Sequence, residues 1–164
     1  IQQEKEAFED LTVTIVGDIA HSRVARSAAQ GLTAMGVKEL RLVSPKEFMP
    51  SKKLTSISKH FTNLDEGLKN ADVVMALRIQ HERMEDKNNI NLDNYIKNYR
   101  ITHKAMRIAK PDAIIMHPGP MNRNVEIESS LADGEQSVIL RQVANGVAVR
   151  MALLNQLTKN YEAQ

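Results

Sequence analysis

Short apolar runs alternate with longer amphipathic stretches along this chain. Apolar, mostly branched residues predict strands at residues 11–18, 39–43, 72–77 and 113–116, and a weak alternation predicts a short strand at residues 57–62. Helices are predicted between them at residues 23–35, 64–70 and 102–109, the first capped by Ser22 and the last by Thr102. This alternation predicts an α/β fold: a doubly wound, mainly parallel, Rossmann-like sheet of about five strands with helices on both faces.

Three further stretches complete the pattern. Residues 1–10 are charged and predict the end of a helix that begins before this chain, and residues 88–100 predict a loop followed by a helix. Residues 137–159 predict one long C-terminal helix whose apolar positions cover a broad face. That face is wider than a helix lying on one side of a sheet needs, so we expect another element to cover part of it.

Composition narrows the possible functions. The 164 residues suffice for one domain, and a net charge of +2 is too small to argue for nucleic-acid binding. Aromatic residues make up 4% and include no Trp, which leaves no stacking platform for bases. No apolar run approaches the roughly 20 residues of a membrane span, and no signal peptide is recognised. The absence of cysteine excludes disulfides, thiolate metal sites and cysteine nucleophiles, and a cytoplasmic location fits.

Polar groups gather where the strand at residues 72–77 ends, at Arg78, Gln80 and Glu82. Ligands of open α/β sheets bind outside the carboxyl ends of the strands. There Arg78 offers a planar fork of donors suited to a carboxylate or a phosphate, and Gln80 would point to the same side. Glu82 would hold one of the arginines, Arg78 or Arg83, in place. The alternative is a solvated loop with a surface ion pair.

A second cluster, His21, Ser22 and Arg23, follows the first predicted strand. After Gly17 the sequence has no further glycine until Gly31, and these side chains are too bulky for a pyrophosphate to approach the backbone closely. A helix N-terminus that carries an arginine favours a small anion instead. The alternative is a basic first turn with Arg23 facing solvent. The first and fourth strands are expected to be neighbours, which would bring both clusters to one edge.

The third cluster is His117, Pro118, Gly119 and Pro120, directly after the last predicted strand. Proline has no N–H group, so carbonyl oxygens here would be free to receive a ligand's amine. The double-proline turn also predicts that the Gly119–Pro120 bond is cis. The alternative is a rigid turn with His117 as a hydrogen-bonded edge histidine. Further along the loop, we expect Arg123 and Glu126 to form an ion pair that braces it.

Four segments in this order and spacing resemble the carboxyl-terminal, aspartate-binding domain of the aspartate carbamoyltransferase family: residues 16–27, 77–83, 116–123 and 142–150. The resemblance extends over essentially all of residues 1–164. Ornithine carbamoyltransferases share the fold, but they carry His-Cys-Leu-Pro at the third segment. Pro118 stands in place of that cysteine, which disfavours ornithine as the substrate.

The resemblance implies the transfer of a carbamoyl group from carbamoyl phosphate to L-aspartate, an early step of pyrimidine synthesis. It implies that Arg23 and Arg78 hold the two carboxylates of aspartate, while Gln80 helps to place the amino group and Glu82 orients Arg78. Backbone carbonyls near Pro118 and Gly119 would receive the attacking amine. Neither a metal nor an organic cofactor is implied. Supporting roles are expected for six further residues: His21, Arg83, His117, Pro120, Arg123 and Glu126.

The family's amino-terminal half carries a Ser-Thr-Arg-Thr phosphate-binding motif, which this sequence lacks. The first residue is Ile1, not Met, so we expect a fragment or processed product: half of an enzyme, inactive alone. By resemblance, the helix at residues 137–159 packs on the absent carbamoyl-phosphate domain. The complete chain would form a homotrimer, possibly with regulatory or pathway-enzyme chains. Two alternatives are a carbamoyltransferase for another amino acid and a non-catalytic α/β module that binds acidic metabolites.

Overall fold

The computed structural model describes residues 1–79 and 91–162, with side chains through residue 159, and contains one parallel sheet. The strand order is β3-β2-β1-β4-β5, and every neighbouring pair in the described sheet is parallel. All five predicted strands are confirmed, each somewhat shorter than or equal to its predicted run. They are β1 (Thr12–Val16), β2 (Glu39–Val43), β3 (Lys59–Phe61), β4 (Val73–Ala76) and β5 (Ile114–Met116).

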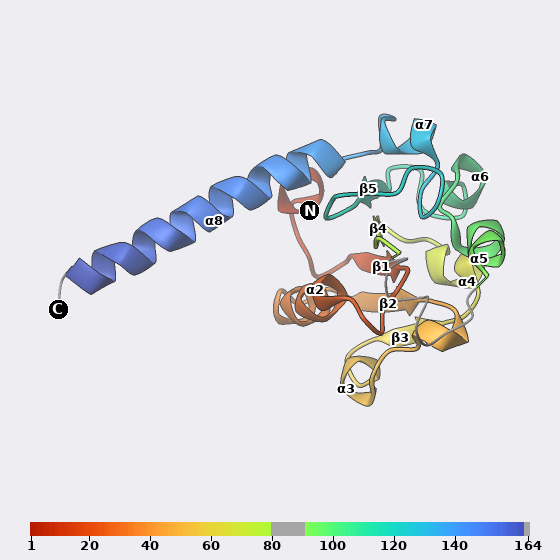
Figure 1. The fold of residues 1–164 in the computed structure, drawn as a ribbon, viewed down its shortest axis with the longest axis horizontal. Coiled ribbons are helices and arrows are strands. Elements are labelled where there is room, and N and C mark those ends of the chain that lie inside the picture. The colour runs from red at the N-terminus through yellow and green to blue at the C-terminus, as the bar shows by residue number, and fades with distance from the viewer. Residues whose placement is uncertain (80–90, 163–164) are drawn as a thin grey trace.

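Helices connect these strands and cover the sheet (Figure 1). The predicted caps are confirmed, because Ser22 accepts a hydrogen bond from Ala25 N and Thr102 accepts one from Ala105 N. The helices are α1 (Gln2–Lys5), α2 (Arg23–Ala34), η1 (Lys46–Phe48), α3 (Lys52–Thr55), α4 (Leu64–Leu68), α5 (Leu92–Tyr99), α6 (His103–Met106), α7 (Ser129–Ala132) and α8 (Ile139–Glu162).

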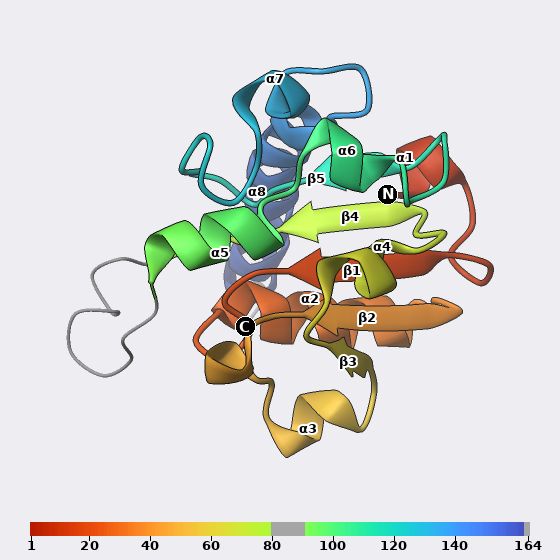
Figure 2. The same cartoon turned by 90° about the vertical axis from the view of Figure 1, so that its right-hand side faces the viewer.

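Side chains alternate across the sheet and build an apolar layer on each face. Val13 and Ile15 join the layer formed with α2, while Val16 joins the layer formed with α4, α6 and α7. Both faces of β1 and β4 are therefore buried, as expected for a parallel sheet wound on both sides. Figure 2 shows α4 and α6 in front of the sheet and α2 behind it. The predicted doubly wound α/β architecture is confirmed.

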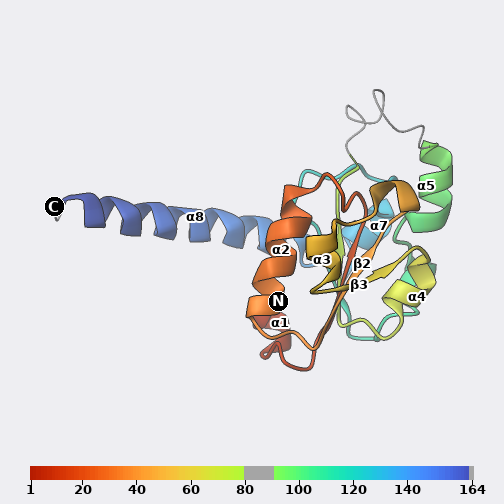
Figure 3. The same ribbon diagram turned by 90° about the horizontal axis from the view of Figure 1, so that it is seen from below.

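Helix α8 extends away from the rest of the molecule and, among the described residues, is attached to it only at its base. Its base is anchored by buried Ile139 and by two contacts with α1, an Arg141–Glu4 ion pair of 2.5 Å and an Asn145–Gln3 hydrogen bond of 3.0 Å. Farther along, α8 extends away from the sheet (Figures 1 and 3). None of the helices in the described ranges is both long and apolar enough to cross a bilayer.

Candidate functional site

The carboxyl edge of the sheet brings together the loops that follow β1, β4 and β5. Strand β1 pairs with both β2 and β4, so the strand order reverses at this position, and β4 pairs with β5. All arrowheads point to one edge, where α5 also lies (Figure 2). The prediction that the first and fourth strands are neighbours is confirmed. This is the edge at which open α/β sheets bind their ligands.

Gly17 allows β1 and β4 to end side by side. Its φ angle is +135°, and a Cβ atom at this position would lie 2.9 Å from Leu77 O and 3.0 Å from Leu77 Cβ. Backbone conformation and available space therefore both require glycine. As a result, the loop that carries Arg23 begins directly beside the loop that carries Arg78.

Buried Asp18 fixes His21 in the first of these loops. Its Oδ1 atom accepts hydrogen bonds from His21 N at 3.1 Å and from His21 Nδ1 at 2.9 Å. The edge of the His21 ring meets the Phe48 ring, with 5.9 Å between centroids. The sequence pattern indicated His21 but neither of these two partners. A Gly-Asp pair at a strand end was the only local signal for Asp18, and no local pattern indicated Phe48.

Arg23 is the first residue of α2 and is exposed. Within the described ranges, its guanidinium forms no hydrogen bond or ion pair. It could therefore receive an anion or simply face solvent, the two alternatives that the sequence left open. Arg78 lies two residues beyond β4, partly exposed, at the same edge. Gln80, Glu82 and Arg83 lie outside the described residues, so their roles stay predictions.

The turn after β5 is held by hydrogen bonds of buried His117. His117 Nδ1 accepts a hydrogen bond from Gly119 N at 2.9 Å, and Gln142 Oε1 of α8 accepts one from His117 N at 2.9 Å. The Gly119–Pro120 bond is cis, as predicted. No hydrogen bond from the described residues reaches the carbonyl oxygens of Pro118 or Gly119. These oxygens are available to a donor from outside the domain.

The predicted Arg123–Glu126 ion pair is wrong. Arg123 forms a bidentate pair with Asp133, at 2.6 and 2.9 Å, which lowers the pKa of the Asp133 carboxyl. Glu126 turns inward instead, and its Oε1 atom lies 3.2 Å from His117 Nε2. The reason is local backbone geometry: Asn124 has a φ angle of +64° and reverses the chain between the two residues.

An apolar cluster of Phe48, Ile79 and Tyr95 packs beneath this edge, with partly buried Val125 and Tyr99 at its border. Burial raises the pKa of Tyr95, and the nearby carboxylates of Glu126 and Asp18 raise it further. The phenol therefore remains protonated and lies close enough to sense both carboxylates. The cluster joins segments from four loops and helices, which single-sequence patterns do not bring together.

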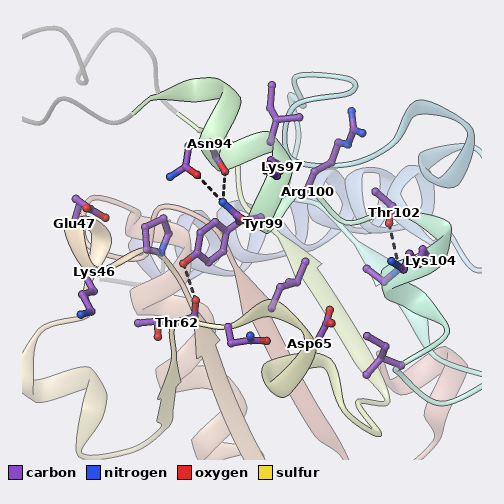
Figure 4. Close-up of a pocket in the computed structure, with 17 residues that line it drawn as sticks. Lys46, Glu47, Thr62, Asp65, Asn94, Lys97, Tyr99, Arg100, Thr102 and Lys104 are labelled. Carbon is purple, nitrogen blue, oxygen red and sulfur yellow. Dashed lines mark hydrogen bonds between the residues drawn. The ribbon is translucent and has the colours of Figure 1, made fainter.

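A polar cavity of about 940 Å³ lies apart from the three loops, between α4, α5 and α6. Figure 4 shows Lys46 at one end of it and Lys104 at the other, so its cationic groups do not converge on one point. The Tyr99 hydroxyl donates a hydrogen bond to Thr62 O across its wall, at 2.7 Å. In residues 1–79 and 91–162, no cluster of three or more His, Asp or Glu side chains could hold a metal ion.

Comparison with known proteins identifies the family. Residues 9–157 match the model of the aspartate/ornithine carbamoyltransferase Asp/Orn binding domain. The aspartate carbamoyltransferase catalytic subunit of Ruthia magnifica subsp. Calyptogena magnifica is 52% identical over 157 residues, which are 96% of this chain and 49% of that protein. The chain thus spans about half the length of this curated relative.

Two solved structures share the fold. Aspartate transcarbamoylase from Trypanosoma cruzi, in complex with carbamoyl aspartate and phosphate, is 25% identical with a TM-score of 0.81, over 93% of this chain and 50% of that chain. Ornithine carbamoyltransferase from Pyrococcus furiosus is 21% identical with the same TM-score of 0.81, over 94% and 51%. By its sequence, its sheet and the loops at its carboxyl edge, the chain belongs to the aspartate/ornithine carbamoyltransferase family and forms its Asp/Orn binding domain.

Proposed function

We propose that this chain is the aspartate-binding half of an aspartate carbamoyltransferase. The complete enzyme would transfer the carbamoyl group of carbamoyl phosphate to L-aspartate, giving N-carbamoyl-L-aspartate and phosphate. The observation that carries this proposal is the 52% identity to an aspartate carbamoyltransferase catalytic subunit over 96% of the chain. Pro118 supports aspartate over ornithine, because ornithine enzymes carry a cysteine at this place in the motif.

The chemistry asks for two kinds of group from this domain. Aspartate carries two carboxylates, and the guanidinium forks of Arg23 and Arg78, from adjacent loops, match them. Its amine needs acceptors that orient the nitrogen lone pair, and the carbonyls of Pro118 and Gly119 accept no hydrogen bond from the described residues. Neither group reacts covalently. Their contribution is to position the amine for attack and to fix its orientation.

In the reaction, the amine nitrogen forms a bond to the carbamoyl carbon through a tetrahedral intermediate. The bond from that carbon to the phosphate oxygen then breaks, phosphate leaves with the bonding electrons, and the nitrogen loses a proton. Groups that stabilise the oxyanion and hold the phosphate would come from the half of the enzyme that this chain does not span. The complete chain would work as a cytoplasmic homotrimer in pyrimidine biosynthesis, open to association with regulatory or pathway-enzyme chains.

Helix α8 would pack on the carbamoyl-phosphate half. Leu140 is 84% exposed, and further apolar side chains are exposed at helical spacing along the same side of α8: Val143, Val147, Met151, Leu154 and Leu157. A contiguous apolar stripe of this kind is unusual on a monomer and marks an interaction surface. A domain that continues the same polypeptide is the occupant that the half-length match supports.

Replacing Arg78 tests the proposed function. In the full-length enzyme, Arg78→Ala should raise the KM for aspartate and lower kcat, because a lost charge-assisted contact costs roughly 2–5 kcal/mol. Arg78→Lys should recover little of this loss, since an ammonium group lacks the planar fork. Steady-state kinetics with varied aspartate measure both effects.

Arg107→Ala is the matched control, because Arg107 is exposed at the end of α6 and belongs to none of the three loops. It should leave aspartate kinetics unchanged. A lost substrate contact of roughly 2–5 kcal/mol corresponds to more than a tenfold effect, since about 1.4 kcal/mol is tenfold. If Arg78→Ala changes the aspartate kinetics by less than about threefold, Arg78 is not a substrate ligand.

A further inference from the structure

Glu126 is a buried carboxylate that is linked by hydrogen bonds both to the turn with the Pro118 and Gly119 carbonyls and to the backbone beside Arg78. Its side chain is 1% exposed, and its Oε1 atom is 3.2 Å from His117 Nε2 and also accepts a hydrogen bond from Asn122 N. A buried carboxylate is costly unless hydrogen bonds compensate it. These two hydrogen bonds join Glu126 to residues nine and four positions earlier in the chain and therefore hold the loop after β5 together.

One connection runs to the carbonyl groups. His117 Nδ1 accepts a hydrogen bond from Gly119 N at 2.9 Å, so the ring proton is on Nε2 and is donated to Glu126. Glu126 thereby sets the tautomer and the orientation of His117. The His117 ring in turn fixes the backbone of Gly119 and the direction of the neighbouring carbonyl oxygens.

The other connection runs to Arg78. Asn122, whose backbone N–H is held by Glu126, donates a hydrogen bond from Nδ2 to Ile79 O at 3.1 Å. Ile79 directly follows Arg78 and is fully buried against Tyr95. The backbone beside Arg78 is therefore attached to the loop after β5 through Asn122, and Asn122 is attached through Glu126.

We propose that Glu126 is a positioning residue that sets the separation between Arg78 and the carbonyls of Pro118 and Gly119. This rests on the proposed function, in which Arg78 receives a carboxylate and those carbonyls receive the amine. Glu126 touches neither group of the substrate. It acts through His117 on the amine side and through Asn122 on the carboxylate side, so it matches the site to the distance between amine and carboxylate in aspartate.

The two connections can be separated by the choice of ligand in the full-length enzyme. Succinate, a dicarboxylate of the same length without the amine, senses only the carboxylate side. Asn122→Ala should therefore weaken succinate inhibition and raise the aspartate KM by similar factors. Glu126→Ala should raise the aspartate KM and lower kcat by about ten- to a hundredfold, because small misplacements of reacting groups are that costly. Succinate inhibition should weaken less than aspartate binding in this variant.

Two further variants separate positioning from general damage. Glu126→Gln keeps an oxygen that can accept the hydrogen bonds from His117 and Asn122. Its amide nitrogen would stand in place of Oε2, which forms no hydrogen bond with the described residues, so no existing bond is lost. It should stay within about threefold of the parent enzyme, since uncharged acceptors still form such hydrogen bonds. Glu128→Ala is the matched control, because Glu128 accepts from His103 N on the outer side of the same segment. Glu128→Ala should leave the aspartate KM and the succinate inhibition constant unchanged.

The KM for carbamoyl phosphate should not change in any of these variants. Unchanged aspartate kinetics in Glu126→Ala would overturn the proposal, and so would equal losses for aspartate, succinate and carbamoyl phosphate. If Glu126→Ala does not fold, unchanged succinate inhibition in Asn122→Ala overturns it instead. An Arg78→Ala enzyme with unaltered aspartate kinetics would count against the proposed function. Sensitivity at Arg78 without sensitivity at Glu126 and Asn122 would count against this inference alone.

Discussion

Tyr95 and Tyr99 stack one turn apart on α5, 5.4 Å between ring centroids, but their hydroxyl groups lie in different environments. The Tyr99 hydroxyl donates to Thr62 O at 2.7 Å, whereas the Tyr95 hydroxyl is buried without a hydrogen-bond partner among the described residues. Tyr99→Phe should therefore lower the free energy of unfolding by about 0.5–1.5 kcal/mol. Tyr95→Phe should leave it unchanged or raise it by about 1 kcal/mol, because it removes an unsatisfied buried group.

Urea unfolding of the two variants beside the parent chain measures both effects. Each variant is the control for the other, since the same atom is removed from neighbouring rings of one helix. An equal loss of stability in the two would mean that the Tyr95 hydroxyl has a partner in solution.

His60 makes stability depend on pH. Burial lowers its pKa below the ordinary value of 6.5, although a hydrogen bond with Ser44 opposes the shift. Because the folded state binds this proton less readily than the unfolded state, the contribution is fully present above about pH 6.5 and is lost as the pH falls below it. His60→Gln keeps a donor for the Ser44 hydroxyl and removes the titration.

The measurement is the free energy of unfolding of both proteins at several values between about pH 7 and about pH 5. The parent chain should lose stability relative to His60→Gln as the solution becomes more acidic. Parallel curves for the two proteins would mean that His60 titrates equally in the folded and unfolded states.

Single-residue predictions succeeded where the signal was local. Ser22 and Thr102 cap helices, and the Gly119–Pro120 bond is cis, because each depends on a few neighbouring residues. The partners of Glu126 could not be predicted in this way. Arg123 and Glu126 are three residues apart and of opposite charge, but the positive φ angle of Asn124 separates them. The Asn122–Ile79 hydrogen bond joins residues 43 positions apart, for which no local pattern exists.

At the scale of elements, the five strands and the pairing of the first with the fourth followed from apolar runs and the rules of α/β folds. The short helices α3 and α7 were not predicted, because four residues are too few to show a helical period. Helix α6 ends at Met106 rather than at Ala109, since the chain continues with hydrogen bonds from residue i to i−3. The helix at the N-terminus covers only Gln2–Lys5, not residues 1–10.

Helix α8 leads to a prediction about association. Its exposed apolar stripe should make the 164-residue chain self-associate or unfold easily, because large exposed apolar patches favour association. Leu140→Glu together with Leu154→Glu should give a monomer. Gln156→Glu adds a charge on the opposite side of the helix and should change nothing.

Light scattering of the three purified proteins over a range of concentrations gives their masses. A parent chain that is a stable monomer, with a melting temperature unaffected by the two leucine substitutions, would show that α8 needs no partner.

At the scale of the molecule, the three loops at the carboxyl edge would, in the proposed function, supply the groups that bind aspartate. The family and the fold could be recognised from four sequence segments because their spacing is specific. How the loops are braced could not be recognised, since Glu126, Asn122 and Ile79 meet only in the folded chain. Because the chain matches 49% of the curated relative, the proposed function assigns the other half of the site to a segment that this chain does not span.

Carbamoyl transfer by the 164-residue chain alone, compared with the full-length enzyme, tests whether this domain supplies only part of the active site. Phosphate release and N-carbamoyl-L-aspartate formation are measured with both substrates present, on protein shown to be folded by a cooperative thermal transition. We predict no turnover above the uncatalysed rate for the chain alone and normal turnover for the full-length enzyme. Turnover by the chain alone at a rate comparable to the full-length enzyme would show instead that this domain is catalytically complete.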